Sequence, residues 1–186
     1  MDLSEAISSR RSVRQFSGRV ITRAEIERML DAAVQAPNHR LTQPWRFYVL
    51  GPDARRAYAA VLGARKAKKV EDPVAAKAVI DKVVATASAL PAQIAVTMTL
   101  AENPEVREED YAATMMAVQN LLLTARSLGL ATHLRSGAVM GDPNARAALG
   151  IPDGERIVVM IDLGEPAEAP EAKPRRAAAE VTTWLP

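Results

Sequence analysis

Two apolar segments constrain the fold of this chain more than any other feature. Residues 93–100 read QIAVTMTL and residues 156–163 read RIVVMIDL, and both are rich in β-branched side chains. Short apolar runs of this kind are typical of buried strands. Two further strands are expected, at residues 46–50 (RFYVL) and in LATHLRSGA, which starts at residue 130. The sequence therefore predicts about four strands in one central sheet.

Capping residues and helical periodicity mark the segments between these strands. Thr22 and Glu25 have the spacing of a capping box, and apolar residues recur behind them every three or four positions. Helices are expected from Leu3 to the arginines at residue 10, from Thr22 to Pro37, from Pro52 onward, over residues 74–90, from Glu108 to Leu128, and from Asp142 to Gly150. The long helix is expected to carry an apolar stripe of Tyr111, Met115, Val118, Leu122, Ala125 and Leu128. Residues 63–77 are expected to form a solvated basic helical segment. Because helices and strands are mixed along the chain, the predicted fold class is α+β.

The composition is that of one ordinary soluble domain, expected to span residues 1–186. The net charge is only +2, from 24 basic and 22 acidic residues, so we expect no nucleic-acid partner. The absence of cysteine excludes disulfides, thiolate metal sites and a cysteine nucleophile. No signal peptide or membrane-spanning run is visible, so the expected location is cytoplasmic. The tail, residues 166–186, ends in apolar Trp184 and Leu185, which are expected to dock on the core or on a partner.

Most motifs that would give the chain its own chemistry are absent. There is no GxGxxG, no P-loop and no nucleophile elbow, and the two histidines, His39 and His133, lack metal-ligand spacing. An enzyme with this sequence would borrow its chemistry from a cofactor. The dense cluster RRSVR at residues 10–14 suits a phosphate-bearing cofactor, because guanidinium groups bind phosphate oxygens in pairs. The alternative for this cluster is a solvated basic turn.

Four motifs in order resemble one known family. They are RRSVR at residues 10–14, PNHRLTQPW at 37–45, HLRSGA at 133–138 and LGEP at 163–166. Together they resemble the signatures of the nitroreductase family of FMN-dependent oxidoreductases, and most closely its minimal subgroup with the RSGA motif. The resemblance covers nearly the whole chain, from about residue 3 to residue 166.

The resemblance implies a fold, a cofactor and a reaction. The implied fold is a mixed, mainly antiparallel sheet flanked by helices, in an intertwined homodimer with FMN at the interface. The implied activity is hydride transfer from NADH or NADPH to flavin N5, followed by reduction of a nitroaromatic, quinone or similar acceptor in a ping-pong cycle. The alternatives are a non-catalytic FMN-binding or storage protein, and flavin-fragmenting or dehalogenating chemistry on the same fold. The short helical connection between the strands near residues 50 and 94 argues against the last of these.

The resemblance also implies which residues contact FMN. The implied contacts are Arg10, Arg11, Ser12, Lys173 and Arg175 around the phosphate and ribityl chain, Arg14 at the pyrimidine edge, Pro37, Asn38 and His39 from the opposite subunit, and Arg135, Ser136 and Gly137 along the ring. His39 is also a possible proton donor, and no metal is implied. Leu41 stands where the family often has asparagine at the flavin edge. Leu134 stands where the subgroup often has tryptophan, which is expected to reshape the pocket over the ring.

Overall fold

A computed structural model describes residues 1–168 and 170–186 of the chain. Its centre is a four-stranded sheet in the order β1-β2-β4-β3, in which every neighbouring pair is antiparallel. The strands are β1 (Trp45–Val49), β2 (Ala92–Thr99), β3 (Ala131–Arg135) and β4 (Glu155–Gly164). All four predicted strands are confirmed. Among the described residues, parallel pairing is limited to a single bridge between Ser12 and Thr132.

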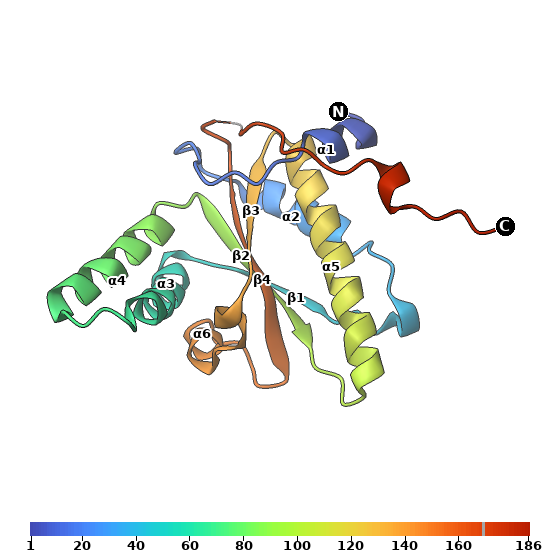
Figure 1. Cartoon of the computed structure of the whole chain (residues 1–186). Helices are drawn as coiled ribbons and strands as arrows, with labels where there is room; N and C mark the ends of the chain where they lie inside the picture. Colours follow the sequence, from blue (N-terminus) through green and yellow to red (C-terminus); the bar gives the residue numbers. More distant parts are fainter. Residues whose placement is uncertain (169) are drawn as a thin grey trace.

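Within residues 1–168 and 170–186, six α-helices accompany the sheet (Figure 1). They are α1 (Leu3–Ser9), α2 (Arg23–Ala33), α3 (Pro52–Ala67), α4 (Pro73–Ser88), α5 (Pro104–Ser127) and α6 (Pro143–Ala148), with short 3-10 turns at His39–Leu41, Ala138–Gly141 and Ala178–Val181. The capping box of Thr22 and Glu25 is confirmed. The basic segment 63–77 is not one helix, because α3 ends within it and the Asp72 carboxylate caps the start of α4. Helix α5 begins earlier than predicted, because Asn103 caps it and Pro104 fills its first position.

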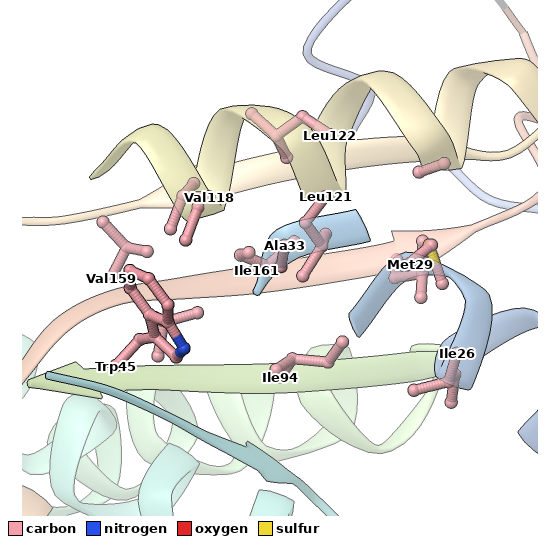
Figure 2. Packing of buried hydrophobic residues seen from close by; sticks show 14 of the residues in the cluster. Ile26, Met29, Ala33, Trp45, Ile94, Val118, Leu121, Leu122, Val159 and Ile161 are labelled. Carbon is pink, nitrogen blue, oxygen red and sulfur yellow. The ribbon is translucent and has the colours of Figure 1, made fainter. Parts of the chain in front are cut away.

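The helices cover the two faces of the sheet in separate groups, and each group closes a core. Helices α2 and α5 pack on one face, where Met29 and Leu121 meet Ile94 and Ile161 (Figure 2). Helices α3 and α6 pack on the other face, in a core that contains Tyr58. Both faces of β2 and β4 are therefore buried, as their continuous apolar sequences predict.

The predicted stripe on α5 is confirmed from Met115 onward and is wrong only at Tyr111. Tyr111 is 41% exposed, whereas Ala113 and Ala117 are buried and continue toward Leu121. Alanine lets the helix approach the sheet closely, so the small residues rather than the tyrosine face the core. Periodicity alone could not choose between the neighbouring faces, because both carry apolar residues.

The C-terminal tail does not dock on the core of its own protomer. Trp184 is 90% exposed and Leu185 is 85% exposed. The prediction that they dock on the chain's own core is wrong, and docking on a partner stays a prediction. Within the described part of the chain, none of the helices combines the length and apolar character needed to span a bilayer.

Candidate functional site

A cavity of about 920 Å³ opens where α1, the arginine cluster, β3 and the tail meet. Its volume lies within the range of cofactor and substrate pockets. Its charged lining consists of Arg10, Arg11, Arg14, Lys173 and Arg175 on the basic side and Glu168 and Glu171 on the acidic side. The fold thus brings the tail pair to the N-terminal cluster, although they are separated by most of the sequence. The surplus of cations favours an anionic ligand.

The backbone of the arginine cluster is fixed alongside β3. The N–H of Val13 donates to the carbonyl of Thr132 at 3.0 Å, and the Val13 side chain is buried. Because side chains alternate along an extended segment, the buried valine turns Ser12 and Arg14 outward. Two polar side chains are therefore held at the cavity by one apolar anchor.

A close contact fixes the chain just after the cluster. The ring of Phe16 lies over Gly164 at the end of β4, and a Cβ at this glycine would come within 2.8 Å of the ring carbons. The N–H of Ser17 donates to the carbonyl of Glu165 at 2.8 Å. Only glycine allows this approach, so the contact couples the end of β4 to the position of the cluster.

We expect Gly164→Ala to destabilise the protein by about 1–3 kcal/mol, because the added methyl group overpacks against Phe16. Urea unfolding followed by circular dichroism measures the change. Gly154→Ala is the matched control, since an added Cβ there meets no atom within 4 Å. Equal stability of the two variants would contradict this account of the contact.

The three arginines of the cluster differ in what already binds them. The guanidinium of Arg11 donates to the carbonyl of Ser8 at 2.7 Å, so it closes the end of α1. Arg14 is exposed and its Nε donates to Nε2 of His133 at 3.3 Å. Arg10 makes no side-chain hydrogen bond with the described residues. Arg10 and Arg14 therefore keep free donors for a ligand, whereas Arg11 has a structural role as well.

A buried carboxylate, Asp162 on β4, connects the side chains next to the cluster. It is 1% exposed and accepts hydrogen bonds from Arg135 Nε at 2.5 Å and from Gln93 Nε2 at 2.7 Å. The Nδ1 atom of His133 lies 3.5 Å from the same carboxylate. The sequence interpretation missed Asp162 and Gln93. Their signal was an amide in one and a carboxylate in the other of two mostly apolar strands.

His133 is held in its neutral form. Burial lowers the pKa of its imidazole and outweighs the opposing effect of Asp162. Since Nε2 accepts a hydrogen bond from Arg14, the ring proton belongs on Nδ1, which faces Asp162. His133 thus lies between an exposed arginine at the cavity, to which it is hydrogen-bonded, and a buried carboxylate, which its Nδ1 approaches without a hydrogen bond.

The RSGA segment lies beside the cavity rather than in its lining. The guanidinium of Arg135 turns toward Asp162, and neither Arg135 nor Ser136 nor Gly137 lines the 920 Å³ cavity. Ser136 is exposed, and Gly137 has a φ of +123°, a conformation that favours glycine. Contacts of these residues with a flavin stay a prediction.

The neighbouring Leu134 does not line the 920 Å³ cavity. Its side chain packs against the core under α2 and α5, on the opposite side of the sheet. The expectation that leucine at this position reshapes the pocket over the ring stays a prediction. Successive side chains of a strand point to opposite faces, and His133 and Arg135 take the face toward α3.

The loop that contains Pro37, Asn38, His39 and Leu41 lies against α5, away from the cavity of its own protomer. His39 Nδ1 lies 3.0 Å from Glu109 Oε1, and Arg40 Nε donates to Glu109 Oε2 at 2.9 Å. These two partners, Arg40 first, lower the pKa of Glu109 and keep its carboxylate charged. Leu41 is 78% exposed.

This loop also has an unusual backbone. Arg40, Leu41 and Gln43 have φ values of +64°, +52° and +45°, in the left-handed region that is costly for residues other than glycine. The Oδ1 atom of Asn38 accepts the N–H of Gln43 at 2.6 Å and helps to hold this conformation. The loop is therefore preformed, and one protomer does not bring it to the arginine cluster.

The described residues contain no cluster of three or more side chains suited to hold a metal ion. The cavity offers guanidinium and ammonium groups that suit an anionic ligand, next to a neutral histidine.

Comparison with known proteins identifies similar chains. The family model described as "Nitroreductase family" matches residues 7–165. The Bacillus subtilis protein YfhC, named as a candidate NAD(P)H nitroreductase, is 35% identical over 173 residues, which cover 93% of this chain and 89% of that protein. The crystal structure of a nitroreductase-like family protein from Bacillus cereus is 28% identical with a TM-score of 0.87, and the match covers 100% of this chain and 96% of the other. NfnB from Sphigopyxis sp. strain HMH, named as an FMN- and NADPH-dependent nitroreductase, shares the fold at 22% identity and a TM-score of 0.82, with full coverage of both chains (100% and 100%).

Proposed function

Since this chain belongs to the nitroreductase family, we propose that it is an FMN-dependent NAD(P)H oxidoreductase of the minimal subgroup with the RSGA motif. It reduces nitroaromatic, quinone or similar acceptors and acts as a homodimer, in which each chain is one domain. The observation that carries the proposal is the convergence of RRSVR with Lys173 and Arg175 on one cavity of about 920 Å³.

The residues that line this cavity fit FMN. Arg10, Lys173 and Arg175 would bind the phosphate, and Ser12 would donate to the phosphate or the ribityl chain. A charge-assisted hydrogen bond of this kind contributes about 1.5–3 kcal/mol, so several of them hold the cofactor without a covalent link. When bound, FMN supplies hydride transfer through its N5 atom.

Arg14 would lie at the ring end of the same site. Its guanidinium stays charged at every working pH, and the neutral imidazole of His133 holds it in place. A fixed cation beside the ring makes electron uptake by the ring more favourable. The backbone of Ser136 and Gly137 would complete the ring site next to Arg14.

The second subunit would supply the loop with Pro37, Asn38, His39 and Leu41. The strained conformation of this loop, held by Asn38 and by the ion pair of Arg40 with Glu109, gives the loop a fixed shape before any ligand binds. It would close the site against water from the side opposite the arginine cluster. A site built from two chains requires the dimer for binding and for turnover.

The test of this function is the visible spectrum of the purified protein, with chromatography of the cofactor that denaturation releases. We expect a yellow protein that releases about one FMN per chain and oxidises NADH or NADPH with a quinone or nitroaromatic acceptor. A protein that stays colourless after incubation with FMN would overturn the proposal. A yellow protein that oxidises neither donor with any acceptor would be an FMN-binding protein instead.

A further inference from the structure

A second cavity, of about 270 Å³, lies between α3, α4 and the face of the sheet near Gln93 and Arg135. Most of its wall is apolar and comes from residues such as Leu62, Val83 and Leu90. Its volume is at the low end for ligand pockets, so it accommodates a single ring but no nucleotide and no flavin. It shares no lining residue with the 920 Å³ cavity of the proposed FMN site.

The inner end of this second cavity holds an unpaired hydrogen-bond acceptor. Gln93 is 2% exposed, and its Oε1 atom has no hydrogen-bond partner among the described residues. The orientation of the amide is fixed, because Nε2 donates to Asp162 and a carboxylate can only accept. Gln93 lines the cavity, so its unpaired oxygen is a buried acceptor in the cavity wall, and a buried acceptor requires an N–H or O–H donor.

Hydrogen-bond donors lie beside this acceptor. The Nε atom of Arg135 donates to Asp162. The other two guanidinium nitrogens make no hydrogen bond with the described residues. Tyr58 also lines the cavity with a hydroxyl that burial keeps protonated, since burial raises its pKa to about 12. The inner end therefore offers an acceptor and donors side by side. The outer end carries the ammonium groups of the exposed Lys66 and Lys82.

We propose that this cavity binds a small ring compound whose inner edge presents an N–H next to a carbonyl, as a lactam or a carboxamide does, and whose outer end carries negative charge. Gln93 accepts the N–H, Arg135 donates to the carbonyl, and the apolar walls pack against the two faces of the ring. Lys66 and Lys82 attract the anionic end. A carboxylate or a phosphate at the inner edge would leave Gln93 without a donor, so simple anions do not fit the site.

Two kinds of molecule carry this edge, in which an N–H lies next to a carbonyl. One is a free pyrimidine, and the other is a flavin, whose pyrimidine ring has the same edge. The size of the cavity and its separate lining favour a free ligand that binds beside FMN. The two sources differ in whether FMN and the ligand compete, so binding must be measured with and without FMN.

The experiment is titration calorimetry, supported by ligand-observed NMR, with uracil, 3-methyluracil and uracil-6-carboxylate on the FMN-loaded and the flavin-free protein. We expect uracil to bind both forms equally and at least tenfold more tightly than 3-methyluracil, in which the N–H is blocked. Gln93→Leu should remove this preference. Combined replacement of Lys66 and Lys82 by alanine should reduce the preference for uracil-6-carboxylate over uracil, whereas Lys69→Ala, outside the cavity, should leave it unchanged.

Because Gln93→Leu also removes the hydrogen bond to Asp162, a second variant tests the cavity and leaves that hydrogen bond intact. Ala87→Leu, on α4, places a larger side chain in the cavity and should abolish uracil binding while FMN content and thermal unfolding stay unchanged. Equal affinity for uracil and 3-methyluracil, undiminished binding by Ala87→Leu, or absence of binding would overturn the proposal. Competition between uracil and FMN would also overturn the proposal, because the cavity would then bind the pyrimidine edge of the flavin rather than a free ligand. A failure to bind FMN leaves this test intact, since the flavin-free protein is measured separately.

Discussion

Asp162→Ala is expected to lower the free energy of unfolding by about 3–5 kcal/mol, the usual loss when one member of a buried ion pair is removed. The carboxylate is 1% exposed and pairs with Arg135, while Gln93 and His133 meet it from the neighbouring strands. Without it, a partly buried guanidinium and a buried amide lose their acceptor. Urea unfolding at neutral pH measures the loss.

The matched control for this variant is Asp153→Ala. Asp153 also pairs with an arginine, Arg146 at 2.6 Å, but its side chain is 98% exposed. Exposed pairs contribute between zero and about 1 kcal/mol, so this control should be nearly neutral. If the two variants lost the same stability, Asp162 would not be the centre of the network described above.

Arg14→Ala is expected to weaken FMN binding by about tenfold or more and to lower the reduction potential of the bound flavin. One charge-assisted hydrogen bond is worth about 1.5–3 kcal/mol, and 1.4 kcal/mol corresponds to a factor of ten in affinity. The fold should persist, because the side chain is exposed and its one partner in the described structure is His133. Fluorescence titration of flavin-free protein gives the affinity, and a redox titration gives the potential.

Two further variants separate charge from geometry. Arg14→Lys keeps the positive charge but loses the planar guanidinium group with its paired donors. The variant should therefore keep part of the rise in flavin reduction potential that Arg14 causes, and a smaller part of the gain in FMN affinity. Arg28→Ala removes an exposed arginine on α2, away from the cavity, and should change neither value. If the Arg14→Ala protein had the FMN affinity and flavin potential of the wild type, the assignment of Arg14 to the flavin ring would be contradicted.

The sheet was predictable because its central strands carry their own signal. A strand covered on both faces needs a mostly apolar run, and residues 93–100 and 156–163 each supply one. Helix caps can be predicted from sequence as well, because their hydrogen bonds join residues close together in the chain, as in the capping box of Thr22 and Glu25. The face of α5 was less readable, since the choice between Tyr111 and Ala113 depends on what the helix packs against.

The candidate site was predictable only in part. The arginine cluster and the tail pair could be named from motifs, but their shared cavity depends on contacts between segments far apart in the sequence. The role of Asp162 could not be predicted from the sequence, because only the pairing register of β2, β3 and β4 places its partners next to it. The same register turns Leu134 toward the core.

The sequence by itself determined the α+β class, the strands, the caps and the family, because these depend on residue types at short and fixed spacings. Only the tertiary structure decided which side chains share a cavity. Burial and strand register turned His133 and Arg135 toward Asp162. They also left the oxygen of Gln93, a residue that lines a second, smaller cavity, without a partner among the described residues. A hydrogen bond needs its two atoms within about 3 Å, and for residues far apart in the chain only the folded structure sets that distance.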